Sequence, residues 1–359
     1  MILRTAPGAR TRTTPARPGP SRALIATACI LAVPFTAVGL GWVLGRVVRD
    51  RWASLQMLFW MPALAAALAA GAAWLILWIA GGRSRTVRWW RRGCGAVALL
   101  ALAVAAWNDL GWRGWPAEPA AMRAAAGERA PILVTHWNAR WPGRDALLCG
   151  QALAPALGDV TVVSNPGSLL RAAVRELWLP AGWQAMDIGP LAVIVGPGWK
   201  IAPSRMLGIE RFPMVGYIWL AWVVVEREDG VRVRMLVADL PSAPEVARGE
   251  IARCAAVMLG RTPGLPAPDL LLGDLNTTPG SVVWEALAPR NDPAPPWRAS
   301  GWLASYPRES PALRIDAMLA GPALEWVRYR TLDLGFGAHR AQQGIFVATP
   351  AAERAAGSR

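Results

Sequence analysis

Three long apolar stretches in the first 111 residues constrain this chain of 359 residues more than any other feature. They are residues 23–45, 57–82 and 93–111, and each is near the roughly 20 residues that a helix needs to cross a bilayer core of about 30 Å. The strictly apolar part of the third stretch is shorter, so an interfacial or packed helix is the alternative there. The sequence therefore predicts three transmembrane helices followed by a separate domain.

Basic residues are distributed unevenly around these stretches. Residues 1–110 contain 13 arginines against Asp50 and Asp109, whereas the rest of the chain contains 25 basic and 22 acidic side chains. The formal charge of +14 thus belongs mainly to the apolar part and does not indicate a nucleic-acid-binding domain. Arginines gather before the first stretch and between the second and third, which the positive-inside rule places in the cytoplasm. We expect an integral membrane protein with an extracytoplasmic C-terminal domain, facing the periplasm or exterior if the membrane is a bacterial inner membrane.

Composition also predicts the boundaries of the chain's parts. Residues 1–22 are rich in Arg and Pro and are expected to be disordered, residues 112–130 to form a linker, residues 131–350 to form the outer domain, and residues 351–359 to form a disordered tail. A cleaved signal peptide is the competing explanation of the first stretch. A second apolar stretch follows it in place of a cleavage site and a soluble sequence, which favours an uncleaved anchor.

The outer domain alternates strand-like and helical patterns. Apolar or alternating runs predict strands at 132–137, 160–163, 191–195, 214–226, 231–240, 269–275, 315–319 and 344–348. Residues 244–258 predict a helix, because Ala247, Ile251, Cys254 and Met258 fall on one face. This alternation predicts an α/β or α+β domain without internal repeats.

The run LLLGDLNTTP at residues 270–279 predicts a buried strand that delivers polar groups to its end. Asp274 and Asn276 are two residues apart, so their side chains point to the same side of a strand. Together they can act on one phosphate, one metal ion or one attacking water, although a strand end followed by an Asx turn explains so short a motif more simply. Further polar residues stand at other predicted strand ends, namely Asn138, Asp239, Asp316 and His339.

The order and spacing of these motifs resemble the endonuclease/exonuclease/phosphatase superfamily of metal-dependent phosphoesterases, over about residues 131–350. The resemblance implies an α+β fold, a four-layer α/β/β/α sandwich, with a divalent cation, Mg²⁺ or Mn²⁺, at the sheet ends. It also implies catalytic roles. Asp274 would orient or activate the attacking water, Asn276 would bind the phosphate, and Asp316 would be the partner of His339. Asn138 would help to hold the metal and the phosphate.

Three departures from the family pattern fall on the metal site. Asn165 stands where family members usually carry the glutamate that is the main metal ligand. The usual Thr-His-Leu motif reads Ala-Asp-Leu at 238–240, so Asp239 replaces a histidine, and Ala338 stands before His339 in place of an aspartate. Because Mg²⁺ prefers charged oxygen ligands, the loss of the glutamate weakens the expected site, and Asp239 can relocate the ion. The candidate metal ligands are thus Asn138, Asp239 and Asn165.

The sequence leaves the substrate and the activity open. Arg140, Arg314 and Arg340 flank motif residues, and we assign Arg314 and Arg340 as candidate substrate-binding residues because a guanidinium binds phosphate in a bidentate manner. The nearly neutral outer domain makes long duplex nucleic acid a poor substrate, and a small phosphoester or a lipid head group beside the bilayer fits better. The chain is either a divalent-metal-dependent phosphoester hydrolase or a catalytically inactive relative that binds a ligand or partner outside the membrane.

Three further side chains receive structural interpretations. His136 shares strand parity with Asn138, but a buried, hydrogen-bonded structural histidine is the favoured interpretation. Cys149 and Cys254 can form a disulfide in an oxidising compartment. Two separate buried thiols are favoured, because the spacing of these cysteines matches no recognised pattern. The sequence does not determine the oligomeric state.

Overall fold

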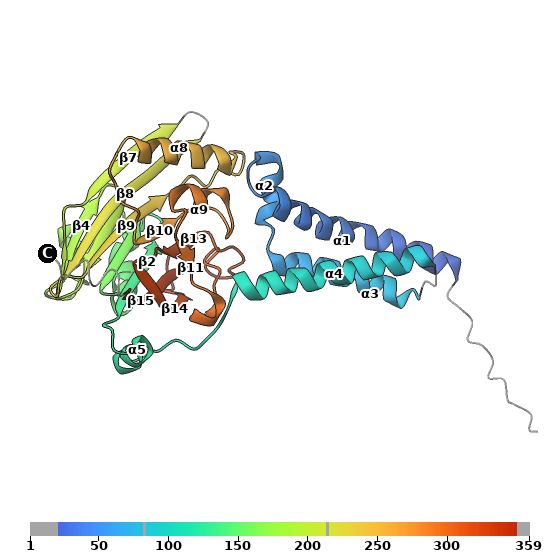
Figure 1. Cartoon of the computed structure of the whole chain (residues 1–359), viewed down its shortest axis with the longest axis horizontal. Helices are drawn as coiled ribbons and strands as arrows, with labels where there is room; N and C mark the ends of the chain where they lie inside the picture. The colour runs from blue at the N-terminus through green and yellow to red at the C-terminus, as the bar shows by residue number, and fades with distance from the viewer. Residues whose placement is uncertain (1–20, 82–83, 213–214, 350–359) are drawn as a thin grey trace, which may run out of the picture.

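The computed structural model describes residues 21–349 apart from 82–83 and 213–214, and it shows a sandwich domain with a helical bundle projecting from one end (Figure 1). The bundle consists of α1 (Arg22–Val48), α3 (Ala63–Ile79) and α4 (Arg85–Asn108), and the short helix α2 (Ala53–Trp60) lies on its domain side. The terminal segments expected to be disordered lie outside the described residues, except for Ser21 and Arg22. Ser21 caps the N-terminus of α1, and Arg22 is its first residue.

Each apolar stretch contains helix, but α1 is the one helix of the described residues that is by itself long and apolar enough to cross a membrane. The second stretch is broken at Met61 and Pro62 into α2 and α3, which are bent by 78° and count together as one further candidate span. Pro62 accounts for the break, because proline disfavours helical backbone in the residue before it. With four arginines among its first eight residues, α4 does not meet the same test. The described residues thus give one candidate span, or two, where three were expected.

Two mixed sheets form the sandwich. The larger has the strand order β1-β12-β14-β15-β2-β3-β5-β4, and the smaller has the order β11-β13-β10-β9-β8-β6, with β7 also paired to β8. The strands of the larger sheet are β1 (Leu110–Trp112), β2 (Ile132–Asn138), β3 (Val160–Ser164), β4 (Gln184–Ile188), β5 (Leu191–Val195), β12 (Ala299–Trp302), β14 (Leu324–Leu332) and β15 (Ala341–Ala348). Those of the smaller sheet are β6 (Trp199–Ile201), β7 (Arg205–Phe212), β8 (Gly216–Arg227), β9 (Arg232–Asp239), β10 (Leu270–Asp274), β11 (Asp292–Pro293) and β13 (Asp316–Ala320).

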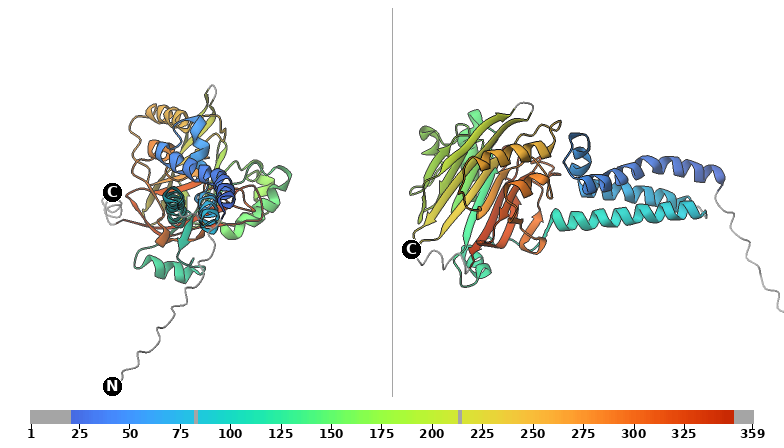
Figure 2. Two further views of the ribbon diagram at one scale, coloured as in Figure 1. Left: turned by 90° about the vertical axis from the view of Figure 1, so that its right-hand side faces the viewer. Right: turned by 45° about the horizontal axis from the view of Figure 1, so that its top comes forward.

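Helices cover the outer faces of both sheets (Figures 1 and 2). On the larger sheet, α6 (Ala146–Leu153) and α7 (Ala172–Arg175) share a core with β3 and β5. On the smaller sheet, α8 (Arg248–Gly260) and α9 (Val282–Leu287) share a core with β8, β9 and β10. A third core, which includes Val193, Val223 and Phe346, fills the space between the sheets. The layers are therefore α/β/β/α, which confirms the expected sandwich.

The linker expected at 112–130 is partly ordered into elements of its own. Immediately after α4, β1 pairs with β12 at the edge of the larger sheet, and α5 (Pro119–Ala126) follows. A Cβ at Gly111 would come within 2.2 Å of the backbone of Ala299 and Ser300, so this close approach requires glycine. The bundle is thus joined directly to a sheet of the outer domain.

Candidate active site

Three neighbouring strands of the smaller sheet carry a carboxylate at the same level. Asp274, the last residue of β10, is paired in register with Asp239 of β9 and with Asp316 of β13. All three side chains are buried. The glycine of the GDLN motif permits the arrangement, because a Cβ at Gly273 would meet the carbonyl oxygen of Ala238 at 1.8 Å. Three carboxylates buried side by side require compensating groups.

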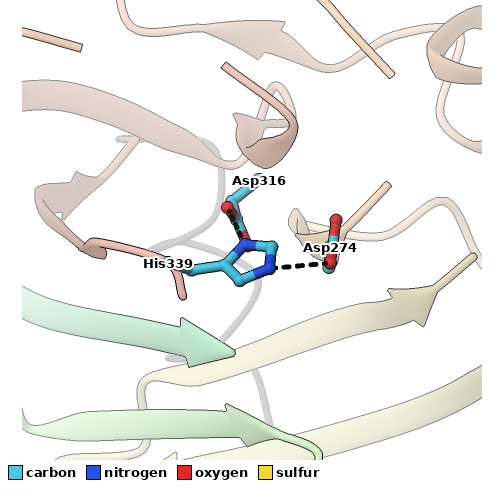
Figure 3. Close-up of side chains that lie close together, drawn as sticks. All are labelled: Asp274, Asp316 and His339. Atoms are coloured by element: carbon cyan, nitrogen blue, oxygen red, sulfur yellow. Dashed lines mark hydrogen bonds and ion pairs between the residues drawn. The ribbon is translucent and has the colours of Figure 1, made fainter. Parts of the chain in front are cut away.

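His339 provides part of this compensation (Figure 3). Its Nδ1 lies 2.9 Å from Asp316 Oδ2 and its Nε2 lies 3.8 Å from Asp274 Oδ2. Burial alone would lower the pKa of His339, but Asp316 and then Asp274 and Asp239 raise it to about 9. Burial alone would raise the pKa of Asp316, but the charge and hydrogen bond of His339 lower it. The expected contact between Asp316 and His339 is confirmed, and it joins an imidazolium to a carboxylate.

Asp274 and Asp239 have less compensation than Asp316. Burial and the charge of Asp316 raise the pKa of Asp274 to about 7. Burial and the charge of Asp274 raise the pKa of Asp239 well above its usual value. Two neighbouring carboxylates with raised pKa values favour the uptake of a proton or a cation.

Two asparagine amides connect these carboxylates. Asn138 Nδ2 donates to Asp274 Oδ2 at 2.8 Å, and Asn165 Nδ2 donates to Asp239 Oδ2 at 2.6 Å and to Asn138 Oδ1 at 3.2 Å. Asn165 Oδ1 is buried and has no hydrogen-bond partner among the described residues. An unpartnered oxygen beside Asp239 is a donor of the type that Mg²⁺ and Mn²⁺ prefer, so the residues present fit such an ion.

Asp274, Asp316 and His339 form a second arrangement that can hold a metal ion. One ligand atom of each lies within 4.8 Å of those of the other two, and all three residues are buried. The second arrangement includes the carboxylate of Asp274. The first, formed by Asn138, Asn165 and Asp239, is linked to Asp274 by the hydrogen bond from Asn138. As an imidazolium bonded to Asp316, however, His339 has no lone pair for a cation, so the side of Asp274 that carries Asn138, Asn165 and Asp239 offers the oxygen donors.

The cluster faces a cavity of about 670 Å³. Six of the sequence-predicted residues line this cavity, namely Asn138, Asn165, Asp239, Asp274, Asn276 and His339. The side chain of Asn276 is partly engaged, because its Nδ2 donates to Leu240 O at 2.7 Å. Residues that lie about 200 positions apart in the sequence thus meet in one place, with Asp316 bonded to His339.

The two arginines expected to bind substrate lie elsewhere. Arg314 donates from Nη1 to Asn108 O at 2.9 Å and lies over the ring of Tyr329, at the junction with α4. Arg340 donates from Nε to Arg308 O at 3.0 Å. Neither is among the residues that line the cavity, whereas Arg140 is. Adjacency in sequence to a motif residue did not place these side chains, because their positions are set by the contacts with Asn108 and Arg308.

The structural interpretations of His136 and the cysteines agree with the structure. His136 is buried, with Nε2 3.1 Å from Ser164 Oγ and Nδ1 3.4 Å from Gln342 Oε1. Cys149 and Cys254 are both buried free thiols. Sequence reasoning missed Tyr306, Met57 and Trp60, which also line the cavity. No motif marks these three residues, and two of them belong to a stretch that its composition assigned to the membrane.

No protein-family model and no curated protein matches the sequence. Solved structures similar to the chain include TDP2 of Caenorhabditis elegans in truncated form, at 17% identity over 61% of this chain and 98% of that chain, with a TM-score of 0.41. The human Nocturnin catalytic domain is 13% identical over 61% of this chain and 94% of that chain, with a TM-score of 0.47. An endonuclease/exonuclease/phosphatase from Beutenbergia cavernae is 16% identical over 61% of this chain and 72% of that chain, with a TM-score of 0.43.

Proposed function

We propose that the outer domain is an endonuclease/exonuclease/phosphatase-type hydrolase that cleaves a phosphoester with a bound Mg²⁺ or Mn²⁺ ion. One observation carries the proposal. Asp274 and His339 come from a strand end and a loop and line one cavity, with His339 Nε2 3.8 Å from Asp274 Oδ2, and Asp316 holds His339 Nδ1 at 2.9 Å. A carboxylate that accepts a proton beside an imidazolium that donates one is an arrangement suited to acid–base chemistry.

Residues of the chain can supply both proton transfers. Asp274, which Asn138 holds by a hydrogen bond of 2.8 Å, takes the proton of the attacking water. The His339 imidazolium keeps its Nδ1–H on Asp316 and delivers its one remaining proton, on Nε2, to the leaving alkoxide. One phosphorus–oxygen bond forms to water and one breaks to the alcohol, so the two proton transfers balance. When bound between Asp239, Asn165 and Asn138, the cation would neutralise charge on the phosphate.

We also propose that the helical bundle anchors the domain in a membrane. Small residues occupy the interior of the bundle, among them Ala32, Ala66 and Ala101. Large apolar side chains such as Ile30, Leu68 and Leu99 are exposed on its outside. A bundle in water shows the reverse pattern, whereas small residues inside and large apolar residues outside are typical of helices packed in lipid. This distribution supports three spanning segments, formed by α1, by α3 with α2 at its domain-side end, and by α4.

The charge distribution then sets the orientation. The arginine-rich start of α4 lies at the end of the bundle far from the domain (Figure 1). The positive-inside rule places that end in the cytoplasm and the domain outside it. A reporter that is active only in the cytoplasm is expected to be silent when fused after Arg359 and active when inserted between α3 and α4. A strong cytoplasmic signal from the C-terminal fusion would contradict the orientation.

The hydrolase proposal is tested with the purified full-length protein. We expect hydrolysis of at least one small phosphoester in a screen of phosphomonoesters and phosphodiesters with millimolar Mg²⁺ or Mn²⁺, and loss of that activity in EDTA. Calorimetry of cation binding provides a readout that does not depend on the substrate. Absence of both turnover and cation binding would contradict the proposal.

The second candidate is a catalytically silent domain that binds a ligand or partner outside the membrane. It is favoured by the bond from Asn165 to Asp239, which holds the asparagine and carboxylate network together without an ion. In this case the calorimetric titration detects no cation binding. Replacing Asp274 with Asn then changes the stability of the domain but no enzymatic activity.

A further inference from the structure

The segment between α1 and α3 is built into the catalytic face of the domain. The buried carboxylate of Asp50 accepts hydrogen bonds from Thr277 Oγ1 at 3.0 Å and from Val282 N at 3.2 Å. The Asp50 carbonyl accepts from Arg248 N at 3.1 Å. Thr277 lies three residues after Asp274, so the bundle holds the loop that follows the proposed catalytic strand.

The helix α2 continues this contact to the cavity. Gln56 donates to the carbonyl of Pro244, and the buried guanidinium of Arg248 lies 4.6 Å from the ring centroid of Trp60. Met57 and Trp60 line the same cavity as Asp274 and His339. One wall of the cavity is therefore formed by a segment that belongs to the bundle.

The walls of the cavity differ in character from its floor. We call the buried lining residues the floor, and they carry carboxylates, amides and an imidazole. The half-buried or exposed lining residues form the walls, and they include Met57, Trp60, Trp141, Tyr217 and Trp219. Trp219 packs against both Trp141 and Tyr217, with ring centroids 6.2 Å and 6.3 Å apart. Side chains of these types lie at the level of lipid head groups in membrane proteins. A polar floor with apolar walls matches a molecule that has a phosphate at one end and hydrocarbon at the other.

The cavity lies where a membrane lipid would be found. All three bundle helices run away from the domain, and α2 connects the domain-side ends of α1 and α3 (Figures 1 and 2). With 27 residues, α1 is about 40 Å long, which exceeds a bilayer core of about 30 Å. In the orientation proposed above, the segment that follows α1 and the helix α2, which contact the domain through Asp50 and Gln56, lie at the head-group level of the adjacent leaflet.

We propose that the substrate is a phosphoester lipid of this leaflet, whose phosphate reaches Asp274 and His339 while its apolar part lies against Met57 and Trp60. The inference rests on the proposed hydrolase function. It assigns to α2 a role in selecting membrane-resident substrates over soluble phosphoesters and oligonucleotides.

The test compares matched substrates with the full-length protein reconstituted in phosphatidylcholine vesicles. The lipid substrates are phosphatidic acid and phosphatidylglycerol in the vesicles, and their soluble counterparts are glycerol 3-phosphate and glycerophosphoglycerol. We expect kcat/KM for a lipid to exceed that for its counterpart at least tenfold. Met57→Gln is expected to lower this lipid-to-soluble ratio by about tenfold, since it removes apolar contact with the hydrocarbon.

Trp52→Gln is the matched control. Trp52 precedes α2 and is 56% exposed, Met57 is 58% exposed, and only Met57 lines the cavity. The ratio is expected to be unchanged in the control. Equal rates on lipid and soluble esters, an unaltered ratio in Met57→Gln, or hydrolysis of oligonucleotides alone would overturn the lipid inference and leave the hydrolase proposal standing. Hydrolysis of no substrate, together with no cation binding by calorimetry, would overturn both.

Discussion

Replacing Asp274 with Asn is expected to reduce phosphoester hydrolysis by about a thousandfold, which corresponds to about 4 kcal/mol of transition-state stabilisation. The asparagine keeps the shape of the side chain, and its single oxygen can still accept from one of the two donors, Asn138 Nδ2 or Asn276 N, which bond to different oxygens of the carboxylate at 2.8 Å and 3.0 Å. It cannot take a proton from water. The loss is expected in kcat rather than in KM, because the change removes a proton acceptor and leaves the apolar walls intact.

Asp159→Asn is a suitable control for this prediction. Asp159 is also a partly buried carboxylate that accepts a backbone hydrogen bond, from Leu133 N at 2.7 Å, but it does not line the cavity. Its replacement is expected to change the rate less than about twofold, since it touches no proposed catalytic group. Equal losses in the two variants would show that turnover responds to stability rather than to Asp274.

The Asp274→Asn variant is also expected to change how stability depends on pH in EDTA. The pKa of Asp274 is raised to about 7 by burial and by Asp316, whereas an unfolded aspartate titrates near about 3.9. The folded protein therefore binds the extra proton between these values, and stability falls as the pH rises through this window. The amide of the Asp274→Asn variant does not ionise, so the variant does not lose stability in this window for this reason. The melting temperature of the variant minus that of the parent should therefore increase from pH 4 to pH 7. A difference that is constant with pH would contradict the raised pKa.

The sequence predicted the sandwich better than the bundle, for a physical reason. Strands buried on both faces, such as β5 at Leu191–Val195 and β10, are continuous apolar runs, and β10 ends on the polar residue Asp274; both features are local. Short or edge strands such as β4, β6 and β12 were missed because their residues are partly exposed and lack an apolar run. Apolar composition placed residues 57–82 in one span, but it carries no information on the break at Pro62 or on the docking of α2 against the domain.

The candidate site was predictable to the extent that strand ends determine it. Asp239, Asp274 and Asp316 stand at the ends of neighbouring strands, so register brings them together. Asn138 ends β2 of the other sheet, and the packing of the two sheets brings it to Asp274. The wall formed by Met57 and Trp60 depends on tertiary contacts made by Arg248 and Asp50, which no local pattern records. The same distinction explains Arg314 and Arg340, whose positions depend on the junction with α4 and on the loop at Arg308.

Substitutions at Asp239 and Asn165 are expected to change cation affinity in opposite directions. Asp239→Asn removes one of the two carboxylates with raised pKa values and should weaken Mn²⁺ binding beyond detection, together with turnover, because neutral oxygens hold a hard cation poorly. Asn165→Glu places a carboxylate where the amide now donates to Asp239 at 2.6 Å. In the presence of Mn²⁺ the added charge should tighten binding by about tenfold or more.

Without a cation the effect of Asn165→Glu should reverse. A glutamate at this position removes the hydrogen bond to Asp239 and adds like charge to a cluster that already contains Asp239, Asp274 and Asp316. We therefore expect a lower melting temperature than the parent in EDTA and a higher one in excess Mn²⁺, since a ligand that binds only the folded state stabilises it. Calorimetry and thermal melts of both variants measure the two effects separately. If Asn165→Glu lowers the melting temperature equally with and without Mn²⁺, the cation does not lie between Asn165 and Asp239.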